Sequence, residues 1–247
     1  AKGPAAAAVA PGAAGGARSL AYFVDWGPIR LAEVSLDLAA AADGGLTASA
    51  RGASLGLAAA IADFEVAQTV AYAPDGAALY EAAARFSDRD SRRVVRFPAE
   101  GAPEVLEARE ERRDDAREIT PIPPGELADV VDPAFPVVDA LRRVAAGEGC
   151  GGTWRVFDGV RRMNITLVDE GPDVIEADRD WTYAGPALRC RLRFERVGGF
   201  PPRREDQPEE TEYDRLLWIA QLEDGPAPVR LRVSWPLGYA TGRIVLR

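Results

Sequence analysis

Apolar and polar residues alternate along most of the chain after residue 17, and this period of two predicts β-strands that bury one face. In the stretch 19–39 the alternation continues on both sides of the tripeptide Trp26-Gly27-Pro28, which predicts a hairpin. We expect about ten strands, most of them paired antiparallel. Further alternating stretches occur at 46–53, 78–97, 154–167, 181–197, 215–222, 229–237 and 240–247.

The stretch 55–73, LGLAAAIADFEVAQTVAYA, carries two conflicting signals. Its alanines favour a helix, whereas the segment FEVAQTVAY at 64–72 favours a strand. We predict a strand for most of this stretch.

One short helix is predicted near the middle of the chain. Asp132 can cap its N-terminus and Pro133 suits the first helical position, although Pro136 could delay the start to Val137. Gly147 should end the helix. Apolar residues recur at helical spacing between these limits: Val137, Val138, Leu141, Val144 and Ala145.

The dipeptide Asp158-Gly159 predicts a two-residue hairpin turn between the strand that contains Trp154 and Val156 and the strand that contains Met163, Ile165 and Leu167. The apolar residues of the second strand should face the core, and Arg162 should lie on the opposite face. The alternative is a catalytic role for Asp158 beside an arginine, and the turn is the simpler interpretation.

These elements predict one all-β, mainly antiparallel domain over residues 18–247. An Ala/Gly/Pro-rich leader at residues 1–17 should be disordered. A strongly curved sheet or open β-barrel, shaped like half a barrel around the one short helix, fits the pattern best. Such a sheet offers a concave apolar surface.

The composition excludes several classes of function. A net charge of −9 argues against a nucleic-acid binder, which needs positive charge to displace counterions from phosphates. No apolar run approaches the length of a membrane span, so no transmembrane segment is expected. The absence of histidine excludes Ser-His-Asp and Cys-His catalysis within the chain and removes the commonest metal ligand.

We expect no metal and no cofactor. Asp88 and Asp90, in the sequence SDRD, are a weak signal for a divalent cation and are better explained as a solvated turn.

Cys150 and Cys190 are the two cysteines of the chain. In an exported protein they would form one disulfide, and in a cytosolic protein they would be two buried thiols. The N-terminal stretch AKGPAAAAVAPGAAGGA has the character of a mature end left after signal-peptide removal, although a trimmed chain would look the same. We predict the disulfide and a periplasmic location.

Five arginines alternate on two predicted strands: Arg189, Arg191, Arg193, Arg230 and Arg232. If these strands are neighbours, one face of the sheet carries five guanidinium groups and could bind anionic headgroups or an acidic partner. The alternative is a solvated outer face whose arginines pair with acidic residues elsewhere in the chain.

Four segments occur in an order that resembles a known family. They are YFVDWGPIRLAEVSLDL at 22–38, VDPAFPVVDALRRV at 131–144, CGGTWRVFDGVRRMNITL at 150–167 and CRLRFERVGGF at 190–200. Together they resemble the uncharacterised proteobacterial envelope proteins of domain of unknown function 3108. The chain departs from that pattern at Phe135-Pro136, where the family has small residues. The resemblance implies a signal peptide, a periplasmic location and a curved half-barrel similar to lipoprotein carriers, but no known activity.

The sequence therefore predicts a non-enzymatic periplasmic protein of the cell envelope. Its curved sheet would bind an apolar or lipid-like ligand, or an envelope protein partner. A structural or interaction module with a filled core is the alternative. A glycan hydrolase that uses carboxylates alone is a further alternative, because that chemistry needs two acids and no histidine.

Overall fold

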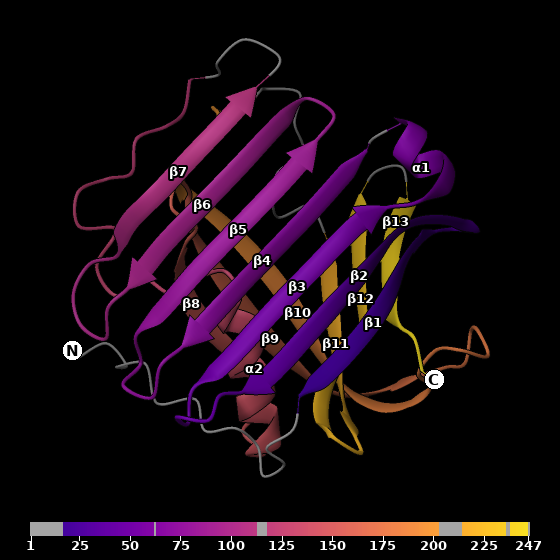
Figure 1. The fold of residues 1–247 in the computed structure, drawn as a ribbon. Helices are drawn as coiled ribbons and strands as arrows, with labels where there is room; N and C mark the ends of the chain where they lie inside the picture. The colour runs from indigo at the N-terminus through magenta and orange to yellow at the C-terminus, as the bar shows by residue number, and fades with distance from the viewer. Residues whose placement is uncertain (1–16, 62, 113–117, 203–213, 236–237, 247) are drawn as a thin grey trace.

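The computed structural model describes residues 17–61, 63–112, 118–202, 214–235 and 238–246. In these residues the chain forms thirteen strands and two helices (Figure 1). The strands of the first half are β1 (Arg18–Trp26), β2 (Ile29–Ala40), β3 (Leu46–Ser54), β4 (Phe64–Tyr72), β5 (Ala78–Phe86), β6 (Arg89–Phe97) and β7 (Glu104–Arg112). Those of the second half are β8 (Gly152–Phe157), β9 (Arg162–Ile175), β10 (Gly185–Gly198), β11 (Arg215–Leu222), β12 (Gly225–Trp235) and β13 (Gly238–Ile244).

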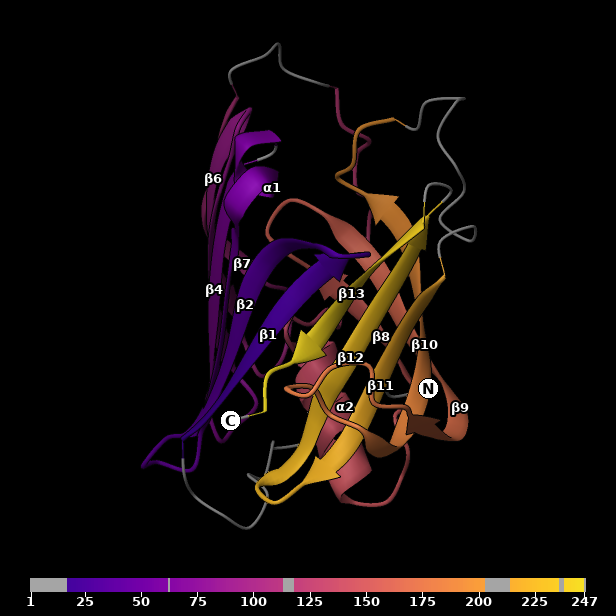
Figure 2. The same ribbon diagram turned by 90° about the vertical axis from the view of Figure 1, so that its right-hand side faces the viewer.

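All the described strands belong to one antiparallel sheet, in the order β7-β6-β5-β4-β3-β2-β1-β13-β12-β11-β10-β9-β8. Each half is a meander of sequential neighbours, and the halves join where β1 pairs with β13, with Tyr22 opposite Ile244. The end strands β7 and β8 do not pair with each other, so the sheet is not closed. It bends instead into two facing layers, β1–β7 and β8–β13 (Figure 2).

This architecture confirms the predicted fold class, a curved and open antiparallel sheet. Residues 1–16 of the predicted leader lie outside the described residues. Neither described helix has the length and apolar character needed to cross a membrane.

Helix α1 (Gly56–Ile61) corrects the prediction of a single helix and of a strand through most of 55–73. Gly56 has a φ of 54°, a left-handed conformation that suits glycine and lets the chain turn away from β3. The N–H groups of Ala58 and Ala59 then donate to the carbonyl of Leu55, at 3.1 and 3.4 Å. The alanines therefore follow their helical propensity in this connection, and the strand signal applies only from Phe64 onward.

Helix α2 (Phe135–Ala145) confirms the predicted central helix, although it begins two residues before Val137. Pro136 lies in its first turn, where a missing N–H costs nothing. Asp132 stabilises this start as expected, because its Oδ1 accepts the N–H groups of Ala134 at 2.8 Å and Phe135 at 3.1 Å.

Helix α2 lies between the two layers, toward the end opposite α1 (Figures 1 and 2). On one side Val138 packs against a cluster from β3–β6 that includes Val70, Tyr80 and Val95. On the other side Leu141 packs in a cluster with residues of β8–β11. The helix therefore fills the interior at its own end of the molecule.

The predicted two-residue turn at Asp158-Gly159 is wrong. Phe157 pairs with Arg162, so residues 158–161 form a longer loop. The Asp158 carboxylate accepts the N–H groups of Val160 at 3.0 Å and Arg161 at 2.6 Å, which stabilises this loop.

Arg162, which was predicted on the face opposite Met163, is nevertheless buried, with 1% of its surface exposed. Its Nε donates to the carbonyl of Glu126 at 2.8 Å, and its Nη2 lies 3.2 Å from the Glu126 carboxylate. A segment that crosses from β7 toward α2 thus covers the Arg162 side chain.

Within that crossing segment, residues 118–134, Val131 forms a parallel bridge with Val156 at the free edge of β8. The N–H of Val131 donates to the carbonyl of Arg155 at 2.8 Å, and the N–H of Phe157 donates to the carbonyl of Val131 at 2.9 Å. The edge of β8 is therefore covered by the protein's own chain.

The predicted disulfide between Cys150 and Cys190 is present. Both residues are fully buried, with their Cα atoms 6.4 Å apart. The bond attaches the chain that follows α2 to strand β10, within the cluster that contains Leu141 and Trp154.

Candidate functional site

The inner face of the first layer is filled at one end and open at the other. On β4 the inward-facing Val70 and Tyr72 are buried, whereas Phe64, Val66 and Gln68 are only half-buried. Strand β5 repeats this gradient along its length. The buried end of this face packs against α2, and the half-buried end lies at the α1 end of the layer (Figure 2).

A hollow of about 310 Å³ lies at the half-buried end, on the inner face of β2–β6. Small residues in the middle of these strands leave this space unfilled. The residues that line it from the inner face are Val34, Ala50, Gly52, Phe64, Val66, Gln68, Tyr80, Ala82, Ala84, Ser91 and Arg93. Arg51, Ala67 and Ala83 border the hollow in sequence positions that alternate to the opposite, exposed face.

Strand register places three polar side chains around the alanines of this hollow. Gln68 pairs with Ala82, which pairs with Arg93 on the other side. In the next inward-facing row Ala84 pairs with Ser91. Directly paired residues lie on the same face, so all three polar groups face inward.

Arg93 is the charged residue whose side chain faces the hollow, and it is 9% exposed. Its Nη1 lies 2.5 Å from the Asp158 carboxylate, and its Nη2 lies 3.5 Å from Glu110. Arg161 lies 3.9 Å from the same Asp158. The ion pairs join β6 and β7 to the loop after β8, and so connect the two ends of the open sheet.

Tyr80 forms part of the hollow on the side of the filled core. It is 4% exposed, and this burial raises the pKa of its hydroxyl above the ordinary value, with the nearby Asp158 adding to the effect. The hydroxyl therefore keeps its proton at neutral pH.

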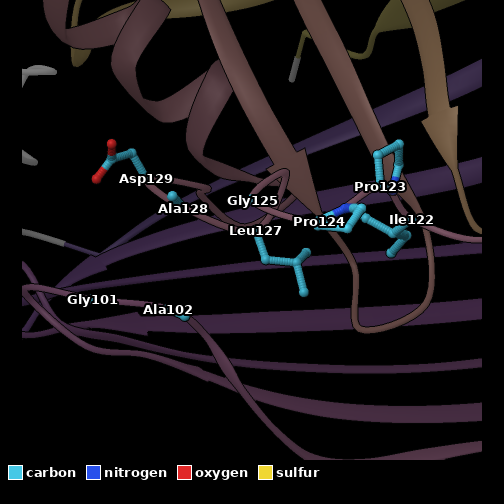
Figure 3. Close-up of a pocket in the computed structure, with 9 residues that line it drawn as sticks. All are labelled: Gly101, Ala102, Ile122, Pro123, Pro124, Gly125, Leu127, Ala128 and Asp129. Carbon is cyan, nitrogen blue, oxygen red and sulfur yellow. The ribbon is translucent and has the colours of Figure 1, made fainter.

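A second hollow, of about 470 Å³, lies on the surface where the crossing segment meets the β6–β7 connection (Figure 3). Leu127 extends toward the chain that carries Ala102, whereas the carboxylate of Asp129 points away from it (Figure 3). The full lining is Gly101, Ala102, Ile122, Pro123, Pro124, Gly125, Leu127, Ala128 and Asp129. Few polar side chains converge there, so the inner hollow is the stronger candidate for a binding site.

Neither hollow provides the acid pair that a carboxylate-based glycan hydrolase requires. The surface hollow has Asp129 alone, and no carboxylate lines the inner one. Asp88 lies in the β5–β6 turn, and Asp90 is the second residue of β6, where it pairs with Arg85. Within the described part of the chain, no group of three or more potential ligand residues is arranged to hold a metal ion.

The five arginines of the predicted face lie on β10 and β12 and share one face of the sheet. The two strands are not neighbours, because β11 lies between them. Arg189 and Arg230 both pair with Trp218, one from each side. Arg191 and Arg232 flank the next residue of that face in the same way. The arginines therefore form two columns separated by buried apolar residues.

Four of these five arginines contact groups of the protein itself. Arg189 and Arg191 form ion pairs with Glu170, Arg230 pairs with Asp178 at 3.2 Å, and Arg232 lies over the Trp218 ring at 5.6 Å. Arg193 is exposed. This arrangement favours an outer face whose arginines pair within the protein over a face that binds anions. Binding of an anionic partner by these arginines stays a prediction.

The fold and the inner hollow define a class of protein: an open, β-barrel-like sheet with a partly filled concave interior. No family model matches the chain, and no curated protein matches it either. The resemblance to domain of unknown function 3108 therefore stays a prediction.

Among solved structures, the chain is similar to the crystal structure of a β-barrel-like protein of domain of unknown function 1849 from Brucella abortus. The TM-score is 0.55 at 11% sequence identity, covering 93% of this chain and 95% of that chain. At this identity the similarity concerns the fold alone, and it extends over nearly the whole of both chains.

The residues of the inner hollow are ones that the sequence did not single out. Ala82 and Ala84 belong to the predicted strand 78–86, but alanine carries no chemical signal of its own. Gln68 and Ser91 interrupt the apolar face of their strands. A polar residue at an inward-facing position is the signal that could have identified them.

Proposed function

We propose that this protein is a non-enzymatic periplasmic protein of the cell envelope that binds an apolar or lipid-like ligand in the inner hollow. The observation that carries the proposal is the gradient along β4 and β5, where one continuous inward face passes from fully buried to half-buried. A protein that needed only a packed core would bury this inward face along its whole length. Exposed apolar surface in a concavity is a common feature of ligand sites.

The periplasmic part of the proposal is supported by the disulfide between Cys150 and Cys190. Disulfides of this kind persist in oxidising compartments and are rare in the cytosol. Fractionation of cells that express the full-length gene, with detection by antibody, tests the location. Recovery of the protein in the reduced cytosolic fraction would count against it.

Binding can be tested with N-phenyl-1-naphthylamine, an uncharged apolar dye whose fluorescence rises in an apolar site. We expect saturable binding to the wild type. Ala84→Trp places a large ring in the hollow and should abolish binding, whereas Ala83→Trp places the same ring on the exposed face of the same strand and should leave it unchanged. Circular dichroism would establish that both variants are folded.

The alternative is a structural or interaction module for an envelope protein partner, and the α2 end favours it because that interior is filled. Equal dye binding by Ala84→Trp and Ala83→Trp would place the binding elsewhere. If the protein binds no dye and an organic extract of the native protein contains no lipid, the structural or interaction module is the favoured function.

A further inference from the structure

The polar groups of the inner hollow have unused hydrogen-bonding capacity. Gln68 and Ser91 both face the hollow, and neither side chain has a hydrogen-bond partner among the described residues. The Nε of Arg93 is buried and also lacks a partner in the described part of the chain. Buried polar groups are normally paired, so the unpaired Nε of Arg93, beside two half-buried side chains with free hydrogen-bonding groups, indicates a ligand that supplies the partners.

The three groups all offer a donor. The guanidinium offers its Nε–H, the glutamine its amide N–H groups and the serine its hydroxyl. Gln68 and Arg93 are two strands apart with Ala82 between them, so their Cα atoms are separated by roughly 10 Å. The small alanine leaves room for a ligand group between the two longer side chains.

The charge of Arg93 is already balanced. Asp158 and Glu110 occupy its two terminal nitrogens, and Arg161 adds a second positive charge beside Asp158. Two carboxylates thus accompany two guanidinium groups. An additional carboxylate from a ligand would be placed near Asp158 and Glu110 and would be repelled by both.

The remainder of the hollow is apolar. Val34, Val66 and Phe64 line the side toward α1, where the Phe64 ring also lies 6.3 Å from that of Phe86. An acyl chain can lie along this side while its head contacts the donors.

We propose that the inner hollow binds an uncharged acylated amphiphile, whose ester or amide carbonyl oxygens accept hydrogen bonds from Gln68, Ser91 and Arg93. This inference rests on the proposed binding of an apolar ligand and adds the chemistry of its head. The ligand class is therefore acyl esters or acyl amides without a free carboxylate.

The test compares 1-monolauroylglycerol, laurate and dodecane as competitors of bound N-phenyl-1-naphthylamine. They share a twelve-carbon chain and differ in the head. The uncharged ester should displace the dye at about a tenfold lower concentration than either of the others, which is the scale expected for one or two net hydrogen bonds. Equal or tighter binding of laurate would overturn the proposal.

The donors are tested by Gln68→Leu combined with Ser91→Ala, which removes two of them without touching the Arg93 ion pairs. We expect about tenfold weaker binding of the monoacylglycerol, with dye binding unchanged. Thr69→Val, a polar-to-apolar change on the exposed face of β4, is the matched control and should have no effect.

Unchanged affinity of the double variant for the monoacylglycerol would also overturn the proposal. If the wild type fails to bind the dye, the proposed function itself is wrong. If the dye binds and the three competitors are equivalent, only the assignment of the head is wrong.

Discussion

The hydroxyl of Tyr72 on β4 donates a hydrogen bond of 3.0 Å to Oδ1 of Asp132, just before helix α2. The same oxygen accepts the N–H groups of Ala134 and Phe135. Asp132 is 2% exposed, and burial raises its pKa from 3.8 to about 6, even though these hydrogen bonds oppose the rise. One buried carboxyl group thus links the first layer to the helix inside it.

Asp132 should make stability decrease as the pH rises from about 4 to about 6. Between the unfolded and folded pKa values the folded state binds more protons, so raising the pH favours unfolding in this window, and the contribution is constant above it. Asp132→Asn keeps an oxygen acceptor and removes the titration. Its stability relative to wild type, from urea unfolding, should increase by about 2.4 kcal/mol between pH 4 and pH 7.

Tyr72→Phe is the control for this prediction. It should lower stability by about 1 kcal/mol through loss of the hydrogen bond and should retain the pH dependence. A constant difference between Asp132→Asn and wild type across this pH range would show that Asp132 does not titrate there.

Removal of the disulfide should destabilise the protein strongly. The bond closes a loop with a sequence separation of 40, for which the chain-entropy model gives about 4 kcal/mol. Cys150→Ala combined with Cys190→Ala should lower the free energy of unfolding by about this amount, measured in urea. Wild type unfolded in the presence of reductant should reproduce the result. A loss below about 1 kcal/mol would mean that the cross-link contributes little to this fold.

Gly199 should be intolerant of any side chain. It has a φ of 79°, and a Cβ there would lie 1.9 Å from the carbonyl oxygen of Val160, in the loop that Asp158 stabilises. Gly171 has a similar φ of 88° but no atom within 4 Å of its Cβ position. Gly171→Ala should cost about 1–2 kcal/mol for the backbone conformation alone, and Gly199→Ala at least about 2 kcal/mol more. Equal thermal shifts in the two variants would contradict the close approach.

The sequence predicted those elements whose signals are local. Strands β1 and β2 follow from alternation around Gly27-Pro28, and α2 follows from Asp132 and the spacing of its apolar residues. The disulfide followed from the cysteine count together with the expected compartment.

The errors occur where distant segments determine the outcome. The loop at Asp158 has four residues rather than two, and its carboxylate also pairs with Arg93, 65 residues earlier in the chain. The burial of Arg162 by Glu126 of another segment is a feature that alternation does not reveal. Strand β11 separates the two arginine columns. This could not be predicted, because the local sequence pattern does not specify the order of strands in the sheet.

The inner hollow could not be predicted for a related reason. Its space depends on where α2 stops filling the interior and on the small size of Ala82 and Ala84, and a period of two reports only which way a side chain faces. The pairing of Arg93 with Glu110 and Asp158 joins three segments that no motif connects.

The pairing of β1 with β13 places the seam of the sheet between segments more than two hundred positions apart, as the contact of Asp25 with Arg243 illustrates. Each meander can assemble from sequential neighbours, but the seam can form only after both meanders are present. During that interval β1 exposes an unpaired row of backbone groups in the middle of the future sheet, a template for wrong partners. Aggregation during biogenesis should therefore begin at this strand, and a holdase that shields it would help the chain most.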